Sequence, residues 1–445
     1  MESITSTPKY DQYIDSGYEW IGEIPLHWDL VKLGSCLSPV SVKNCSELPL
    51  LSITREQGVI ERDVDDQESN HNFIPDDLSG YKKLEKGQFG MNKMKAWQGS
   101  YGVSKFTGIV SPAYFVFDFT KAINPEFFNW AIRSKLYISF FGSASDGVRI
   151  GQWDLSKTRM KVIPFVLPSE EEQSLIANFL DKKATQINDA IAIKEQQINL
   201  LKERKQIIIQ QAVTQGLDPN VPMKDSGVDW IGKIPAHWDT LQSKRVFLCK
   251  GGFAFPSQSF IETGIPVLRI SNIQDSSIST KGMVYVDQAT PKILREFKTS
   301  PGDLIFCMTG AGLGKVGILP DDLDGALINQ RVGRIDVNGK LLDKRFAFYV
   351  LTSLGYQKNI RMLGAGLTDN FPNISSEQIA SIEMAIPPIE CQIKIVEKIS
   401  EDLKSIDDSI GLFSKQIDIF KEYKTSLINS AVTGKIKITP EMVKQ

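Results

Sequence analysis

Two runs of polar and basic residues in this chain combine the side chains that contact nucleic acid. One run covers residues 91–106 (MNKMKAWQGSYGVSKF) and the other residues 329–334 (NQRVGR). Asn, Gln and Arg side chains can pair with base edges through two hydrogen bonds, and Lys contacts phosphate. Taken singly, each residue is also compatible with ordinary loop chemistry. Together they predict DNA contacts from Lys93, Lys95, Tyr101, Lys105, Arg149, Lys315, Asn329, Gln330 and Arg331.

The glycine-rich segment Gly310–Lys315 does not meet the requirements of a phosphate-binding loop. That motif places a glycine five residues before its Gly-Lys pair and a Ser or Thr directly after the lysine. Here position 309 is Thr, and Val316 follows Lys315. A tight turn, or a loop lying beside DNA, is the better interpretation of this segment.

No other motif indicates a catalytic site or a metal site. Asp76-Asp77 and Asp321-Asp322 lack the nearby Glu-x-Lys element of a nuclease. The string at 124–127 (NPEF) lacks the second proline of the loop found in enzymes that methylate DNA bases on nitrogen. The five cysteines contain no CxxC pair and there are only three histidines, so zinc sites and disulfide frameworks are not indicated. We therefore predict no catalytic residue and no metal ligand.

The structural elements that would position these residues belong to a sequence pattern that is repeated within the chain. Residues 16–29 read SGYEWIGEIPLHWD, and residues 226–239 read SGVDWIGKIPAHWD. Ten of these 14 positions are identical, at an offset of 210 residues. Further matches at an offset of 219 pair residues 187–191 with 406–410 and residues 212–214 with 431–433. The two histidines of the frame, His27 and His237, are interpreted as structural.

Between these matched frames the two copies hardly agree. Residues 30–150 and 240–370 differ in sequence but are similar in length. Duplication followed by drift is an alternative explanation, although drift would not spare both frames and alter both inserts. Short apolar runs punctuated by Gly and Pro predict strands in both inserts, at 50–53, 113–117 and 266–270, and helices are expected at 125–139 and 343–358. The fold class is therefore α/β (α+β), with two related domains.

Each frame ends in a long amphipathic segment without proline. The first starts near Ser169, an N-cap candidate followed by three glutamates. Apolar residues recur at heptad-like spacing, and two such stripes in one chain predict an antiparallel coiled coil. Separate packing of each helix on its own domain is the alternative. The predicted seam residues are Ile176, Leu180, Ile187, Ile191, Ile198, Leu201, Ile208, Ile395, Ile399, Ile406, Ile410, Phe413, Ile417, Phe420 and Leu427.

Four segments follow from this organisation. The two α/β domains are predicted at residues 1–168 and 216–387, the first spacer helix at 169–215, and the second helix with the C-terminal tail at 388–445. The net charge of the chain is −2, but residues 30–165 and 240–385 each carry a net charge of +3, which suits nucleic acid. No apolar run approaches the roughly 18 residues of a membrane span, and the N-terminus does not resemble a secretory signal. We expect a cytoplasmic protein without a membrane role.

The paired SGxxWIGxIPxHWD strings, the helix starts at 168–173 and the Ala-Val-Thr helix ends resemble the specificity subunits of type I restriction–modification systems. The resemblance covers essentially the whole chain. It implies two target recognition domains, each reading one half of a split, asymmetric site in double-stranded DNA. It also implies that the conserved helices act as a spacer and dock two methyltransferase (modification) subunits.

Cofactors implied by the resemblance belong to partner subunits, and none is expected in this chain. The modification subunits would bind S-adenosylmethionine and methylate adenine N6, while restriction/translocase subunits would use ATP and Mg²⁺. We therefore expect a non-catalytic recognition subunit. Two alternatives stay open: a self-contained DNA-modifying enzyme, which would turn over DNA alone, and a coiled-coil scaffold protein, which would not bind DNA.

Overall fold

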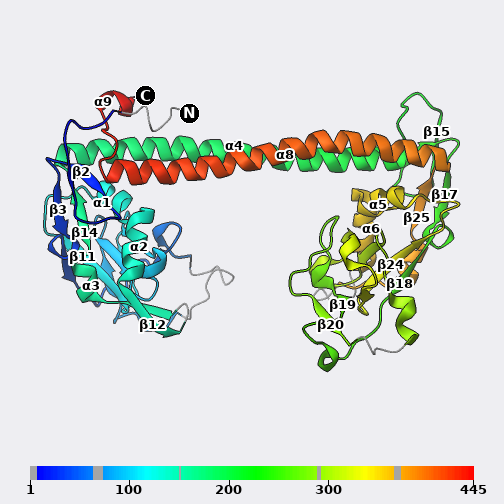
Figure 1. Cartoon of the computed structure of the whole chain (residues 1–445), viewed down its shortest axis with the longest axis horizontal. Coiled ribbons are helices and arrows are strands. Elements are labelled where there is room, and N and C mark those ends of the chain that lie inside the picture. Colours follow the sequence, from blue (N-terminus) through cyan, green and yellow to red (C-terminus); the bar gives the residue numbers. More distant parts are fainter. Residues whose placement is uncertain (1–7, 64–73, 150–151, 288–291, 365–371, 445) are drawn as a thin grey trace. The chain divides into compact units, whose positions relative to one another are not determined.

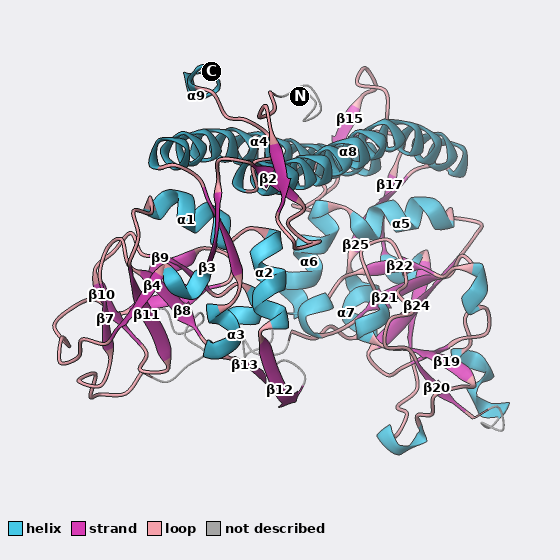
Figure 2. Cartoon of the chain, turned by 60° about the vertical axis from the view of Figure 1, so that its left-hand side comes forward, coloured by secondary structure: helices cyan, strands magenta, loops and turns pink. Residues whose placement is uncertain are grey.

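The computed structural model describes residues 8–63, 74–149, 152–287, 292–364 and 372–444. Contacts between residues divide the chain into two compact units. Unit 1 consists of residues 1–194 and 414–445, and unit 2 consists of residues 195–413. Both units combine helices with strands (Figure 1; Figure 2), which confirms the predicted mixed class.

Two long helices, α4 (Glu170–Gln215) and α8 (Ile389–Val432), each contribute to both units. The acidic first turn of α4 is favoured by the positive end of the helix dipole. Gly216 (φ 76°) and Gly434 (φ 73°) follow the helix ends in the left-handed conformation that glycine adopts without steric cost. The predicted domains stop at the helix ends, whereas the compact units divide both helices internally.

In unit 1 the first half of α4 packs against the last half of α8 (Figure 1). Ile187 of α4 and Leu427 of α8 lie in one buried apolar core. Beside them, Lys424 Nζ donates a hydrogen bond of 2.8 Å to Asn188 Oδ1. The two helices therefore run antiparallel in this unit.

In unit 2 the second half of α4 packs against the first half of α8. Ile209 shares a buried core with Ile395 and Ile399, and Lys205 forms an ion pair with Asp407. The predicted antiparallel pairing is thus confirmed within each unit. Every predicted seam residue is buried or half-buried, whereas Ile193, Leu200 and Ile207 of α4 are exposed.

Unit 1 contains a four-stranded antiparallel sheet in the order β4-β11-β8-β9. Helices cover it, and Phe89, Phe128 and Phe165 form part of the core. The elements of this unit are β1 (Tyr13–Asp15), β2 (Glu23–Pro25), β3 (Asp29–Lys32), β4 (Leu37–Val40), β5 (Leu51–Thr54), β6 (Gly58–Glu61), β7 (Lys82–Leu84), β8 (Phe89–Asn92), β9 (Tyr101–Val103), β10 (Gly108–Val110), β11 (Tyr114–Phe119), α1 (Pro125–Ile132), α2 (Lys135–Ser143), β12 (Ser145–Arg149), β13 (Gln152–Leu155), α3 (Lys157–Lys161), β14 (Pro164–Leu167) and α9 (Pro440–Lys444).

Unit 2 contains a corresponding four-stranded antiparallel sheet in the order β18-β24-β21-β22. A three-stranded sheet, β20-β19-β23, accompanies it. The elements of this unit are β15 (Met223–Asp225), β16 (Lys233–Pro235), β17 (Asp239–Gln242), β18 (Phe247–Gly251), β19 (Ile265–Leu268), β20 (Val284–Val286), β21 (Leu304–Cys307), β22 (Val316–Ile318), β23 (Leu327–Ile328), β24 (Val332–Val337), α5 (Lys344–Thr352), α6 (Leu354–Gly364), α7 (Ser376–Ser381) and β25 (Glu383–Ile386).

The two inserts therefore build the same sheet from dissimilar sequences. In both units the second strand in the sheet order, β11 or β24, leads into a helix, α1 or α5. Each of the predicted insert helices is in fact a pair of shorter helices. Ser134 and Ser353 adopt extended backbone conformations that end the first helix of each pair. Among the described residues, no helix is both long and apolar enough to cross a membrane.

Candidate nucleic-acid interface

In unit 1 the candidate residues Lys93 and Lys95 follow the end of strand β8. Lys95 is exposed. Lys93 is half-buried, and its Nζ lies 3.2 Å from Asp154 Oδ2 on β13. The indoles of Trp97 and Trp153 pack beside this ion pair, with ring centroids 5.0 Å apart. The hairpin β12–β13 is therefore held against the end of the sheet.

Three further lysines gather near Lys93, and no spacing in the sequence revealed them. The pKa of Lys82 is lowered by burial and by the nearby positive charges of Lys157, Lys43 and Lys93. Lys82 Nζ donates 2.6 Å to the carbonyl oxygen of Tyr114 at the start of β11. Lys157 Nζ lies 4.4 Å from the centre of the Phe115 ring. We call Lys43, Lys82, Lys93 and Lys157 the lysine cluster.

The lysine cluster has the chemistry of a phosphate-binding surface. Mutual repulsion disfavours the charged form of Lys82, so an anion placed among these side chains relieves it. The Phe115 ring beside Lys157 provides an apolar contact and leaves the positive charge of the lysines in place. DNA phosphates are the anions that such a field attracts most strongly when several lysines act together.

Tyr101 was wrongly predicted to contact DNA. Its side chain is fully buried on β9, where its ring centroid lies 4.6 Å from that of Phe141. Burial raises the pKa of its hydroxyl. Side chains alternate between the two faces of a strand, and the register of β9 turns Tyr101 into the core. Tyr101 is thus a packing residue.

Lys105, another candidate of unit 1, lies apart from the lysine cluster. Lys105 is exposed just after β9, near the start of β8 rather than its end, because Phe89 pairs with Val103. The structure therefore separates Lys105 from Lys93 and Lys95. Arg149 is the last residue of β12, and its side chain falls outside the described part of the structure.

In unit 2 the structure brings the four candidate residues to one end of the sheet. Cys307 of β21 pairs with Val332 of β24, so the segments flanking these residues meet. The amide of Cys307 donates to the carbonyl of Lys315 (2.9 Å), and the amide of Met308 donates to the carbonyl of Arg331 (3.1 Å). The C-terminal ends of β8 and β21 therefore carry Lys93 and Lys95 in unit 1 and the four candidates in unit 2.

The side chains at this end of unit 2 offer hydrogen-bonding groups to solvent. Gln330 and Arg331 are exposed, whereas Asn329 and Lys315 are half-buried. Arg331 Nη1 donates 3.2 Å to Asn373 Oδ1, and Lys315 Nζ is 3.9 Å from Asp275 Oδ2. The glycine-rich loop closes on itself, since the amide of Gly314 donates to the carbonyl of Cys307. It is thus a tight turn that supports Lys315.

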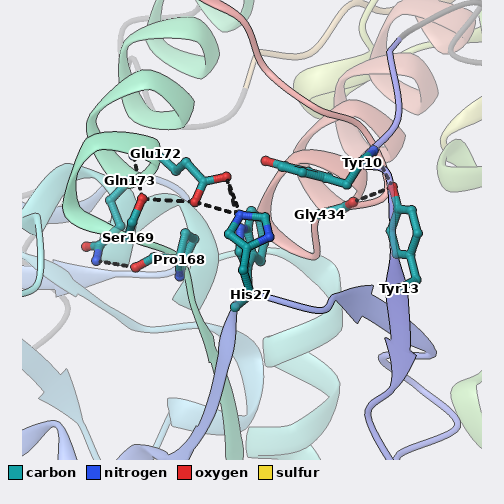
Figure 3. Close-up of polar contacts among 9 residues, drawn as sticks. Tyr10, Tyr13, His27, Pro168, Ser169, Glu172, Gln173 and Gly434 are labelled. Carbon is teal, nitrogen blue, oxygen red and sulfur yellow. Dashed lines mark hydrogen bonds and ion pairs between the residues drawn. The ribbon is translucent and has the colours of Figure 1, made fainter.

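The first frame contains a hydrogen-bonded carboxylate, Glu172 (Figure 3). Its Oε1 accepts from Trp28 Nε1 at 3.1 Å and lies 3.1 Å from His27 Nε2, while its Oε2 accepts from Ser169 Oγ at 2.9 Å. Burial opposes ionisation of Glu172, but the hydrogen bonds from Trp28, His27, Ser169 and Tyr10 outweigh it and lower the pKa of the carboxyl group.

This arrangement ties the frame motif to the start of α4, and its role is structural. At the offset of 219 residues, the second frame has Cys391 in place of Glu172. Both carboxylate oxygens of Glu172 already accept hydrogen bonds from neighbouring side chains, so this group is not free to act as a catalytic acid or base. In the described ranges, no group of three or more His, Cys, Asp and Glu side chains could hold a metal ion.

Known proteins resemble this chain in sequence and in fold. Residues 235–412 match the model of the type I restriction modification DNA specificity domain. The specificity subunit of the type I restriction enzyme MjaVIII from Methanocaldococcus jannaschii is 29% identical over 307 residues, which are 68% of this chain and 69% of that protein. The EcoKI specificity subunit from Escherichia coli strain K12 is 27% identical over 215 residues, 46% of this chain and 44% of that one.

Solved structures share the fold at low sequence identity. A chain from a type I restriction–modification system, solved in a study of complex assembly and conformational transition, has a TM-score of 0.68 at 14% identity and covers 92% of this chain and 98% of its own length. The HsdS subunit from Thermoanaerobacter tengcongensis has a TM-score of 0.51 at 14% identity, with coverage of 95% and 100%. In its duplicated frames, its paired long helices and its sequence, the chain is similar to the specificity subunits of type I restriction–modification systems.

Proposed function

We propose that the chain reads a bipartite, asymmetric site in double-stranded DNA, with one half-site read by each unit. One observation carries this proposal: both units place basic and amide side chains at the same end of an equivalent sheet, although the inserts differ in sequence. Equivalent scaffolds present the two surfaces in the same way, and different side chains on them recognise different bases.

The two surfaces differ in their chemistry. In unit 1 the lysine cluster supplies contacts to phosphate, which position a protein on the duplex without reading its sequence. In unit 2, Gln330 and Arg331 carry groups that can form paired hydrogen bonds, Gln with adenine and Arg with guanine. The two half-sites are therefore expected to differ in sequence.

The same proposal assigns the partners. As a specificity subunit, the chain directs methyltransferase and restriction/translocase subunits to the site that it reads. Because the frame is present twice, we propose that two copies of the methyltransferase subunit bind, one to each frame. S-adenosylmethionine, ATP and Mg²⁺ would be bound by those partners. A protein that directs modification of cellular DNA is expected to act in the cytoplasm.

Exchange of one insert tests the proposal directly. Residues 30–150 are replaced by the insert of a related specificity subunit, the variant is assembled with its methyltransferase partner, and methylated sites are mapped on genomic DNA. One half-site should change and the other should stay the same, because the unit 2 insert is untouched. Exchange of residues 240–370 is the matched control and should change the opposite half.

Three outcomes would contradict the proposal. Loss or change of both half-sites after one exchange would mean that the inserts do not read DNA independently. Methylation or cleavage of DNA by the purified chain alone, with Mg²⁺ and methyl donor, would favour the self-contained enzyme. A complex that neither shifts DNA in a gel nor methylates it would favour the scaffold protein.

A further inference from the structure

Each unit contains a pocket between its insert and its long helix. The unit 1 pocket has a volume of about 460 Å³ and is lined by Gly87, Val103, Pro125, Asn129, Trp130 and Asp181, with Lys86 and Lys105 at its rim. The unit 2 pocket has a volume of about 400 Å³ and is lined by Gly302, Ile318, Phe348, Tyr349, Val396 and Ser400, with Lys344 and Arg345 at its rim.

The two pockets are built from equivalent elements. Gly87 (φ 90°) and Gly302 (φ 77°) occupy the turns before β8 and β21 in the same left-handed conformation. Val103 and Ile318 are the last residues of β9 and β22. Helices α1 and α5 supply a wall in each unit, and their N-caps, Asn124 and Asp343, are also separated by 219 residues.

One polar contact joins the insert to the long helix at each pocket in the same way. In unit 1, Trp130 Nε1 donates 2.8 Å to Asp181 Oδ1 of α4. In unit 2, the hydroxyls of Tyr349 and Ser400 of α8 lie 3.2 Å apart. Both residues of the second pair follow those of the first by 219 positions. Equivalent positions therefore link the insert to the long helix in both units, although the residue types at those positions differ.

The pockets lie at the opposite end of the sheet from the candidate DNA interface. Each pocket is at the start of β8 or β21, and the DNA candidates follow the end of the same strand. Four strand residues separate the two ends by roughly 14 Å. A ligand in either pocket is therefore distinct from the DNA surface.

The lining favours an apolar side chain over a nucleic acid. Val103 and Trp130 in unit 1, and Ile318, Phe348 and Tyr349 in unit 2, present apolar surface. A phosphate inside the pocket would lose hydration against these apolar walls. In unit 1 it would also face the carboxylate of Asp181. Clefts of this kind accept the anchoring side chains of protein partners.

The rim charges define the chemistry of the partner. Two cations stand at the mouth of each pocket, Lys86 and Lys105 in unit 1 and Lys344 and Arg345 in unit 2. Lys344 and Arg345 also contact Asp303 and Asp343, and Glu126 is among the residues that line the unit 1 pocket. Lys86 and Lys105 have no ion-pair partner among the described residues, so both are available to a carboxylate of a bound protein.

We propose that these twin pockets are docking sites for the two copies of the methyltransferase subunit, each receiving an apolar side chain flanked by a carboxylate. Identical partners must find the same feature on both units, and the pockets are such a feature inside inserts that otherwise differ. The inference rests on the proposed function, because it requires two identical partner copies.

Filling one pocket at a time tests the inference. Val103→Trp fills the unit 1 pocket and Ile318→Trp fills the unit 2 pocket, since both side chains line the cavity from the edge of the sheet. The full chain is mixed with purified methyltransferase subunit without DNA, and stoichiometry is measured by native mass spectrometry. Wild type should bind two copies, each single variant one, and the double variant none at concentrations that saturate wild type. Loss of an anchor should weaken the affected site by about a hundredfold or more, as loss of a residue that dominates an interface does.

Matched controls keep the outcome interpretable. Lys121→Trp and Lys340→Trp add the same side chain at exposed positions outside the pockets, again 219 residues apart, and should bind two copies. Lys86→Glu covers the case in which Val103→Trp disturbs folding: it should weaken partner binding and leave DNA binding by the chain alone unchanged.

The possible failures are distinguishable. If wild type binds two copies and both tryptophan variants also bind two with unchanged affinity, the pockets are not docking sites and the proposed function stands. If Lys86→Glu weakens DNA binding instead, this end of the sheet faces DNA and the inference is wrong. If wild type binds no methyltransferase subunit, the proposed function and the inference both fail.

Discussion

Gln173 and Gln392 make the same three hydrogen bonds in the two units, although they are 219 residues apart. Oε1 of Gln173 accepts from the amide of Asn124 (2.8 Å), and Oε1 of Gln392 accepts from the amide of Asp343 (2.8 Å). Each Nε2 donates to the proline carbonyl five residues earlier, at 2.9 and 2.8 Å, and to a loop carbonyl, at 3.4 and 2.8 Å. Both side chains are buried. One glutamine therefore fastens the start of a long helix to the first helix of the adjoining insert.

Replacement of this glutamine should destabilise the unit that contains it. Gln173→Leu leaves the Asn124 amide and the Pro168 carbonyl without their partner, and unsatisfied buried groups cost roughly 1 to 3 kcal/mol each. We expect a total loss of about 2 to 4 kcal/mol, measured by urea unfolding. The matched control is Gln186→Leu on the exposed face of α4, which should change stability by less than about 0.5 kcal/mol. Equal losses in both variants would show that these hydrogen bonds contribute little.

A carboxylate introduced into the helix seam should separate the paired helices. Ile187 and Ile406 are 8% and 9% exposed, so Ile187→Asp or Ile406→Asp buries a charge without a partner. Such changes cost at least about 3 kcal/mol, which thermal unfolding would detect. Thr185→Asp and Ser405→Asp place the same charge at exposed positions of the same helices. An unchanged melting temperature in the isoleucine variants would mean that water reaches the seam.

Glu172 should give unit 1 a pH-dependent stability at a position where unit 2 has Cys391. The folded pKa of Glu172 is depressed, so its contribution is present above the unfolded pKa of a glutamate and is lost as the pH falls through the folded value. Glu172→Gln should therefore be less stable than wild type at pH 7, and the difference should shrink as the pH falls below about 4. Chemical unfolding at several pH values provides the measurement. A difference that stays constant with pH would show that charge is not what Glu172 supplies.

The lysine cluster should contribute affinity without sequence preference. Lys43→Ala or Lys157→Ala should weaken DNA binding to a similar extent for specific and unrelated duplexes, because phosphates are the same in both. The slope of log K against log salt should fall by roughly 0.9 for each phosphate contact that is removed. Lys121→Ala, at an exposed position outside the cluster, is the control and should leave the slope unchanged. A change in the recognised sequence would instead make these lysines base-reading residues.

The sequence alone determined the parts of this protein that depend on local pattern. The duplicated frame, the extents of α4 and α8 and their antiparallel pairing follow from residue identity at fixed offsets and from heptad spacing, which records the apolar face of a helix. The residues at the start of α4 also indicated its helix cap. None of these features needs knowledge of which strands pair.

Only the tertiary structure decided which polar residues meet. The register of β9 turned Tyr101 into the core, and the pairing of β8 with β9 moved Lys105 to the pocket end of the sheet. Tertiary packing also brought Lys43, Lys157 and Lys93 near Lys82, and strand pairing placed Lys315 and Arg331 on the two sides of the Cys307–Met308 segment. A shift of one residue in register exchanges the two faces of a strand, and long-range pairing leaves no trace in local spacing. The two inserts build the same sheet from different sequences. A buried position must be filled by an apolar side chain of suitable volume, but several residue types meet that requirement.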